Sequence, residues 1–217
     1  MQDFNALRTN MVDNQIRTND VTNIALLDAL LEVPRESFAN DVPQELTYLD
    51  EDIALGNGRF LMEPAPFAKL VQACSIKPTD LILDVACANG YSTAVFSKLG
   101  SLVIGLEEDE DLAANAEKTL DALDYDNTAI VKGDLVNGFA KEGPYDVIFI
   151  GGAVGQVPQT LFDQLNEGGR LVAVEGNGNA AVAKLYIKTG SDVSGRSIFN
   201  CAIKPLAGFY KSPEFAL

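Results

Sequence analysis

The chain has 217 residues, enough for one large domain but too few for two ordinary ones. Apolar residues make up 47% and charged residues 22%, which is typical of a globular protein and excludes a disordered or low-complexity chain. Sixteen basic against 31 acidic side chains give a net charge of −15, and the basic residues are scattered singly along the sequence. Such a charge repels nucleic-acid phosphates and anionic membranes, so we expect neither partner.

The sequence contains no histidine, which excludes Ser-His-Asp and Cys-His nucleophiles and an imidazole zinc site. Cys74, Cys87 and Cys201 are odd in number and lie in apolar surroundings, which predicts buried thiols and no metal site. The first residues lack the layout of a signal peptide, and no apolar run approaches the ~20 residues of a membrane span. We therefore expect a cytoplasmic protein.

Residues 1–63 are predicted to form an extension of helices followed by loop. The sequence predicts one helix over residues 4–16. The apolar spacing over 21–31 predicts a second helix, with Asn19 and Asp20 as candidates for its N-terminal cap. The apolar faces of these helices either pack on the rest of the protein or form a homodimer surface.

Pro34 ends the second helix or starts a short one that carries Phe38. The prolines and glycines of 40–64 predict a long ordered loop. A loop of that length inside a compact domain is usually functional.

Residues 64–217 predict a Rossmann-like core within a single domain. Apolar runs alternate with amphipathic segments, and the runs are continuous, as in strands that are covered on both faces. This order predicts a doubly wound α/β fold with a mostly parallel sheet, closed by an antiparallel hairpin around a turn at 191–195. The predicted strands are 81–86, 102–107, 128–134, 145–152, 170–176, 184–190 and 196–206, and the predicted helices are one after Pro64, 91–99, 109–123 and 158–165.

Ligands of such sheets bind beyond the carboxyl ends of the strands, where the strand order reverses. The first strand runs into the turn 84–92, with Asp84 at the strand end and Gly90 opening a helix. Ala86 and Ala88 stand where a dinucleotide-binding turn has glycine. Their methyl groups argue against a pyrophosphate but leave room for a ligand without one.

Acidic residues also follow the next two strands. Glu107 ends the second strand, where an acidic side chain accepts two hydrogen bonds from a ribose diol. Asp134 ends the third strand and is placed to bind an adenine edge. The turn and these acids together resemble the class I S-adenosylmethionine-dependent methyltransferases, in which the acid at Asp84 would lie beside the methionine portion.

A narrower resemblance extends over nearly the whole chain, to the protein-L-isoaspartate O-methyltransferase family. It rests on NMVDNQIR (10–17), LDALLEVPRESFA (27–39), YLDEDIALGNG (48–58), VPQTLFDQLNEGGRLV (157–172) and the closing AIKPLAGF. The resemblance implies S-adenosylmethionine as cofactor, S-adenosylhomocysteine as product and an isoaspartyl carboxylate as acceptor. It implies cofactor contacts at Phe60, Leu61, Met62, Asp84, Ala86, Ala88, Gly90, Glu107, Asp134 and Leu135, and acceptor contacts at Gly58, Arg59, Met62 and Gly151.

The acceptor loop GNGRFLMEP (56–64) departs from the family pattern. Met62 stands where the family has the serine assigned to catalysis, so no residue is assigned as catalytic. Phe60 replaces a threonine and Glu63 a glutamine, and Glu63 would repel a carboxylate acceptor if it faced the pocket. Met62 either lines the pocket or fills a gap in the core.

Three functions remain open from the sequence. A carboxylate with a pKa near ~4 is already ionised and needs no general base, so the lack of histidine is no obstacle to methylating it. Methionine, however, cannot donate the hydrogen bond that serine gives. The chain is therefore a methyltransferase with a less polar or otherwise altered acceptor, a genuine isoaspartyl methyltransferase in which backbone amides replace the serine, or a cofactor-binding sensor without transfer activity.

Overall fold

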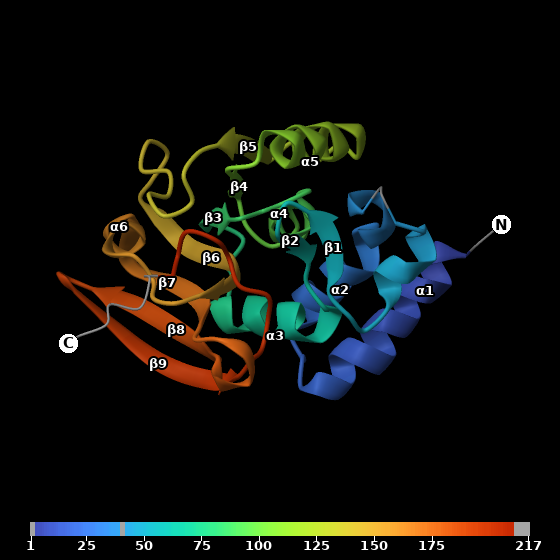
Figure 1. Ribbon diagram of the computed structural model, residues 1–217, viewed down its shortest axis with the longest axis horizontal. Helices are drawn as coiled ribbons and strands as arrows, with labels where there is room; N and C mark the ends of the chain where they lie inside the picture. The colour runs from blue at the N-terminus through green and yellow to red at the C-terminus, as the bar shows by residue number, and fades with distance from the viewer. Residues whose placement is uncertain (1–2, 40–41, 211–217) are drawn as a thin grey trace, which may run out of the picture.

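The structure is a computed structural model that describes residues 3–39 and 42–210. Its centre is a seven-stranded sheet with the order β5-β4-β3-β6-β7-β8-β9 (Figure 1). The first five strands in this order are parallel and the last two are antiparallel. This confirms the predicted doubly wound α/β fold. The strands are β3 (Leu81–Val85), β4 (Leu102–Glu107), β5 (Thr128–Lys132), β6 (Tyr145–Val154), β7 (Leu165–Glu175), β8 (Val182–Thr189) and β9 (Asp192–Asn200).

The strand order reverses beside β3. From β3 the chain moves outward through β4 to β5, and it then returns to β6 on the other side of β3. In β3 every residue after Leu81 is buried, whereas the edge strand β5 is half exposed along its length. Continuous apolar sequence thus marks the central strands, which are covered on both faces. The carboxyl ends of β3 and β6 form the switch point where such folds bind ligands.

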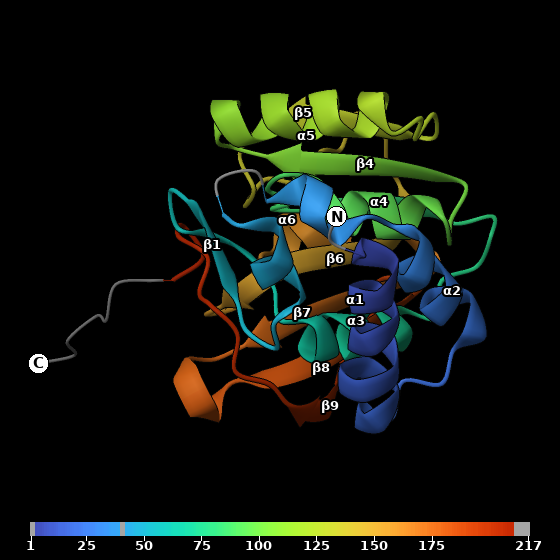
Figure 2. The same ribbon diagram turned by 90° about the vertical axis from the view of Figure 1, so that its right-hand side faces the viewer.

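Two apolar clusters lie on the two faces of the sheet. Ile82 of β3 belongs to the cluster under the N-terminal helices, and its neighbour Leu83 belongs to the cluster under α6, because successive side chains of a strand point to opposite faces. Figure 2 is seen from the side of α1 (Phe4–Met11) and α2 (Ile24–Glu32), and in it β5, β4, β6, β7, β8 and β9 follow one another from top to bottom. The remaining helices are α3 (Pro64–Cys74), α4 (Tyr91–Ser97), α5 (Glu110–Ala122) and α6 (Gln159–Asp163).

The N-terminal segment forms two main helices. α1 (Phe4–Met11) continues through a π-helical turn (Val12–Ile16) and a 3-10 turn (Arg17–Asn19), so the predicted helix is longer and less regular than expected. The cap prediction for α2 (Ile24–Glu32) is wrong. The cap is Asn23, whose side chain accepts from the Leu26 amide at 3.1 Å.

These helices pack on the rest of the chain. Met11, Ile16 and Leu30 are each at most 1% exposed and share the first apolar cluster with α3 and α4. A 3-10 turn (Arg35–Phe38) follows Pro34 and buries Phe38. Of the two alternatives for Pro34, this is the one in which it starts a short helix that carries Phe38. A boundary at residue 63 within a single domain stays a prediction.

The region predicted as loop contains a hairpin. Residues 40–41 of that prediction lie outside the described residues; a 3-10 turn (Gln44–Tyr48) follows them, then the antiparallel strands β1 (Ile53–Gly56) and β2 (Arg59–Leu61). Asn57 and Gly58 join the strands with φ of +49° and +75°. The Asn-Gly pair favours two-residue hairpin turns of this kind and is the signal that the loop prediction missed. The hairpin β1–β2 is the segment closest in sequence to Met62.

The C-terminal hairpin is placed correctly, but its turn is not. β8 ends at Thr189 and β9 begins at Asp192, so the residues predicted as turn, 191–195, lie mostly within β9. β9 also ends at Asn200, and the following residues leave β9 to meet β6. The Ala153 amide donates to the Lys204 carbonyl at 2.9 Å, and the Leu206 amide donates to the Ala153 carbonyl at 2.8 Å. This contact brings Lys204 to the carboxyl end of β6.

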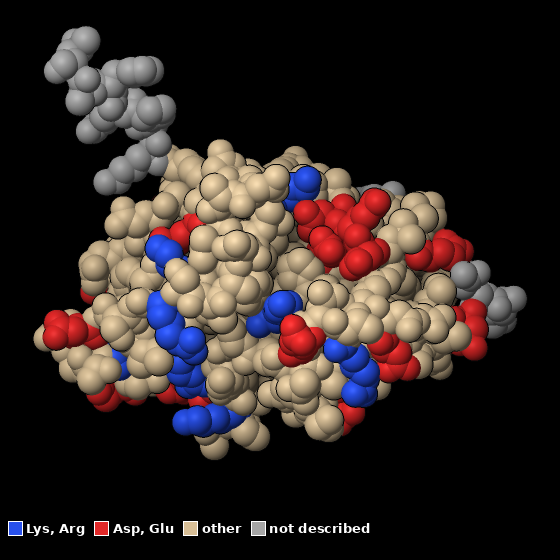
Figure 3. Space-filling model, turned by 90° about the horizontal axis from the view of Figure 1, so that it is seen from below, with Lys and Arg blue, Asp and Glu red and all other residues tan. Residues whose placement is uncertain are grey.

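All three cysteines are buried, and burial raises the pKa of Cys74 to about 12. No helix among the described residues has the length and apolar content to cross a bilayer. On the face shown in Figure 3, basic side chains form a row and acidic side chains gather in separate patches. The row arises only on folding, because lysines and arginines are scattered singly in the sequence.

Candidate active site

Asp84 is the penultimate residue of β3, lies at the switch point and is completely buried. Its Oδ2 accepts hydrogen bonds from the Ser92 hydroxyl at 2.6 Å and the Thr93 hydroxyl at 2.7 Å, both on α4. Its Oδ1 has no partner among the described residues. Burial raises the pKa of Asp84 to about 7, because the charged form loses its hydration and the two hydroxyls compensate only in part.

The turn after Asp84 has the backbone of a glycine-rich turn although it contains alanines. Ala86 and Ala88 have φ of +64° and +48°, a region that residues with a Cβ rarely adopt. The Ala86 amide donates to the Leu106 carbonyl at 2.9 Å, which ties the turn to β4. Gly90 has a φ of +89°, and a Cβ there would lie 3.2 Å from the Cβ of Ala116 on α5, so both the backbone conformation and the close packing favour glycine.

A pocket that is open to solvent lies between this turn and residues 60–62. We call it the turn cavity. Asn89 lines it and is 9% exposed; its Nδ2 donates to the Phe38 carbonyl at 3.2 Å, and its Oδ1 has no partner in the described part of the chain. The other lining residues are mostly apolar: Phe38, Leu55, Phe60, Leu61, Met62, Phe67, Ala86, Cys87, Ala88, Tyr91, Ser92, Phe149 and Gly151.

Glu107, the predicted ribose ligand, ends β4 and is completely buried. Its Oε1 accepts from the amides of Glu108 and Asp109 at 2.9 and 3.1 Å. Its Oε2 accepts from the amide of Ala88 at 3.0 Å. These bonds fix the carboxylate against the turn and against the start of α5.

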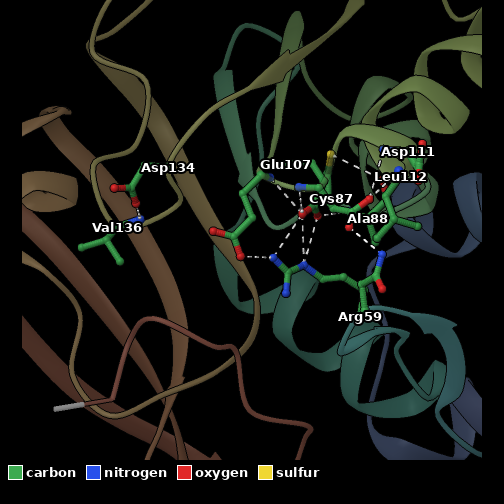
Figure 4. A network of polar contacts seen from close by, with 11 residues as sticks. Arg59, Cys87, Ala88, Glu107, Asp111, Leu112, Asp134 and Val136 are labelled. Carbon is green, nitrogen blue, oxygen red and sulfur yellow. Dashed lines mark hydrogen bonds and ion pairs between the residues drawn. The ribbon is translucent and has the colours of Figure 1, made fainter. Parts of the chain in front are cut away.

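Arg59 of β2 reaches the same carboxylate (Figure 4). Its Nε lies 3.2 Å from both oxygens of Glu107, and one terminal nitrogen lies 3.1 Å from Oε1 of Glu107 and 2.7 Å from Glu108. Arg59 is 4% exposed, so it does not point to solvent. The sequence places Arg59 with the acceptor, whereas the structure places its guanidinium on the predicted ribose ligand.

Asp134 lies in the loop after β5 and is exposed. Its two oxygens accept from the Val136 amide at 2.9 Å and the Asn137 side chain at 2.8 Å. In Figure 4 it lies apart from the Arg59 network and faces Val136. Leu135 is 1% exposed and belongs to the second apolar cluster. Adenine contacts at these two residues stay predictions.

A second, smaller pocket adjoins the turn cavity. Phe60, Met62 and Gly151 line both cavities, so these residues form the boundary between them. All four residues predicted to contact the acceptor line this second cavity, which we call the acceptor cavity. Its lining residues are Asp52, Gly58, Arg59, Phe60, Met62, Gly151, Gly152, Ile203, Lys204, Pro205 and Leu206.

Met62 both lines the cavities and packs in the core. It is 8% exposed, belongs to the first apolar cluster and lines both cavities. Its carbonyl accepts from the buried Arg35 guanidinium at 2.7 Å, which holds the loop backbone. Glu63 lines neither cavity, and burial together with the nearby Asp50 and Asp52 raises its pKa.

Three lining residues, Asn89, Phe38 and Lys204, are not among the site residues predicted from the sequence. Asn89 lies within the quoted turn 84–92, so its polar side chain in an apolar turn was the available signal. No local sequence pattern identifies Phe38 or Lys204 as a site residue. Only tertiary contacts bring these two residues to the switch point. Among the described residues no group of three potential ligands is arranged to hold a metal ion.

Comparisons with known proteins agree with this geometry. The family described as Protein-L-isoaspartate(D-aspartate) O-methyltransferase matches residues 6–209. A Protein-L-isoaspartate O-methyltransferase of Koribacter versatilis is 31% identical over 201 residues, which is 93% of this chain and 90% of that protein. One of Pelotomaculum thermopropionicum is 35% identical over 170 residues, 78% of this chain and 74% of that protein.

Solved structures show the same fold. A protein-L-isoaspartate O-methyltransferase superposes with a TM-score of 0.80 at 24% identity, covering 95% of this chain and 66% of that one. A Plasmodium falciparum protein described as a protein-L-isoaspartate O-methyltransferase, solved with S-adenosyl-L-homocysteine, superposes with a TM-score of 0.73 at 20% identity, covering 95% of this chain and 99% of that one. The chain belongs to the protein-L-isoaspartate O-methyltransferase family, whose members are S-adenosylmethionine-dependent methyltransferases.

Proposed function

We propose that this protein transfers a methyl group from S-adenosylmethionine to the carboxylate of an isoaspartyl residue. The observation that carries the proposal is the pair of cavities that meet at Met62 and Gly151, at the switch point of the sheet. One cavity adjoins the turn after β3, and the other lies under the segment that contains Lys204. A donor and an acceptor bound in the two cavities would face each other across this boundary.

The residues of the turn cavity fit the cofactor. Asn89 Oδ1, in the lining, and Asp84 Oδ1, at the head of the adjoining turn, are buried acceptors without partners among the described residues, and buried acceptors of this kind are normally hydrogen-bonded. The ammonium group of the methionine portion supplies such donors. The left-handed turn at Ala86 and Ala88 passes close to the cavity, and Glu107 would hold the ribose. When bound, the cofactor supplies an electrophilic methyl group on a sulfonium.

The acceptor needs positioning more than activation. A carboxylate is ionised at neutral pH, so the protein has to hold one oxygen in line with the methyl group at about 3–3.5 Å and exclude water. Met62 gives no hydrogen bond. Lys204 lines the acceptor cavity, and its Nζ lies 5.6 Å from the centre of the Phe60 ring. A cation there favours a carboxylate acceptor.

A second candidate is a less polar acceptor. Phe60 and Met62 give the acceptor cavity an apolar lining at its boundary with the turn cavity. Such a lining suits an apolar group. A cofactor-binding sensor without transfer is the third alternative, and a transfer assay separates it from both enzymes.

The test uses a synthetic peptide pair. One peptide carries an isoaspartyl residue and its control carries ordinary aspartate at the same position, each incubated with methyl-labelled S-adenosylmethionine. We expect base-labile methyl ester on the isoaspartyl peptide alone. Binding of S-adenosylhomocysteine without label on either peptide, or on proteins aged to accumulate isoaspartate, contradicts the proposal.

A further inference from the structure

Glu107 has no acceptor position left for a ribose. A carboxylate offers about four lone-pair sites. The amides of Ala88, Glu108 and Asp109 and the guanidinium of Arg59 together occupy both of its oxygens. A ribose diol brings two further donors, so a donor that is present has to leave. Three of the four are backbone amides held by the turn and by the start of α5, which leaves Arg59 as the group that can move.

We propose that Arg59 competes with the cofactor ribose for Glu107 and thereby sets the affinity for the cofactor. Arg59 bonds to both oxygens of Glu107, the atoms that a ribose diol would use. The cofactor then binds only when the guanidinium leaves Glu107. This inference concerns the cofactor site and does not depend on which acceptor is methylated.

Glu108 gives the displaced guanidinium a place to go. It already lies 2.7 Å from Arg59, and its side chain is 45% exposed, whereas the Glu107 side chain is completely buried. A buried charge left without a partner is strongly destabilising. With Glu108 beside it, Arg59 stays paired after it releases Glu107. On release, Arg59 exchanges the buried carboxylate of Glu107 for the half-exposed carboxylate of Glu108 as its partner.

The same contact holds the hairpin β1–β2 down. Arg59 is the first residue of β2, and at the turn of the hairpin Asn57 donates to Asp109 at 2.6 Å. These two contacts tie the hairpin to the end of β4 and the cap of α5. Phe60 and Leu61, which follow Arg59 on β2, line the turn cavity. Release of Arg59 therefore frees Glu107 and also loosens a segment that lines the turn cavity.

The experiment compares S-adenosylhomocysteine with its 2′,3′-dideoxy analogue, which lacks the two ribose hydroxyls. Dissociation constants are measured by titration calorimetry for the wild type and Arg59→Gln. We expect Arg59→Gln to bind S-adenosylhomocysteine about ten-fold more tightly, because the competing cation is gone. The affinity for the dideoxy analogue should change much less, since that ligand makes no use of Glu107.

Arg170→Gln is the matched control. Arg170 pairs with Asp80 at 2.5 Å, with side chains 13% and 5% exposed, at the amino-terminal side of β3, and its removal should leave both affinities unchanged. Should Arg59→Gln not fold, Arg59→Lys carries the same comparison, with a smaller shift in the same direction. Unchanged or weaker binding of S-adenosylhomocysteine, or an equal shift for the two ligands, overturns the inference. Tighter binding without isoaspartyl methylation would instead reject the proposed function alone.

Discussion

Asp84 and Thr93 are joined by a hydrogen bond of 2.7 Å in which the Thr93 hydroxyl donates to Oδ2 of the carboxylate. The bond couples the end of β3 to the first turn of α4. Ser92 makes the second bond to the same oxygen, and Oδ1 stays unpartnered in the described residues. The carboxyl group thus joins β3 to α4 through one oxygen and keeps a buried acceptor on the other.

The first prediction concerns the pH dependence of stability. The pKa of Asp84 is about 7 in the folded protein, against about 4 for an unfolded aspartate. Between these values the native state holds a proton that the unfolded state has lost, so this group's stabilisation is complete below about pH 4 and is lost as the pH rises through about 7. We expect the free energy of unfolding of the wild type to fall relative to that of Asp84→Asn over this range.

Urea unfolding of both proteins at pH 5 and pH 8 measures the difference. Other carboxylates titrate in both proteins and cancel in the comparison. A difference that stays constant between the two pH values would show that Asp84 is ionised throughout.

The second prediction concerns the alanines in the turn. Ala88 has a φ of +48°, where glycine has no steric cost, so Ala88→Gly should stabilise the fold or leave its stability unchanged, by about 0–1 kcal/mol. Ala94→Gly within α4 is the matched control and should destabilise by about 1 kcal/mol or more, because glycine is poor in helices and Ala94 is buried. Equal losses in the two variants would contradict the left-handed turn. Thermal unfolding measures both.

The third prediction concerns Lys204. If it holds the acceptor carboxylate, Lys204→Gln should raise KM for the isoaspartyl peptide about ten-fold, the expected loss for one charge-assisted hydrogen bond, and leave the dissociation constant of S-adenosylhomocysteine unchanged. Lys69→Gln removes a lysine that lies over the Phe199 ring instead and serves as the control. An unchanged KM in Lys204→Gln would remove Lys204 from the acceptor site.

The fourth prediction concerns Met62. Met62→Ser restores a hydroxyl donor at the boundary of the two cavities and should raise the rate on the isoaspartyl peptide by about ten-fold or more. The same change removes buried apolar surface and should lower stability by about 1–2 kcal/mol. Met62→Leu keeps the apolar character without a donor and should not produce the gain. A rate unchanged in Met62→Ser would mean that other groups already position the acceptor.

The sequence alone determined the alternation of strands and helices, because continuous apolar runs and amphipathic periods are local properties of the chain. It also placed the acids that end β3 and β4, since a parallel fold brings the carboxyl ends of its strands to one edge. The hairpin β1–β2 was missed although its Asn-Gly turn is visible in the sequence, and the cap of α2 was assigned three or four residues too early.

The tertiary structure decided how the charged groups pair. The sequence separates Arg59 from Glu107 by 48 positions, and no periodic pattern links a residue of a short hairpin with the end of a central strand. Burial of both side chains then makes the pairing strong enough to determine which group Glu107 holds. The sequence thus predicts a carboxylate at the end of β4. Its pairing with Arg59 depends on the tertiary contact between the hairpin β1–β2 and the end of the sheet.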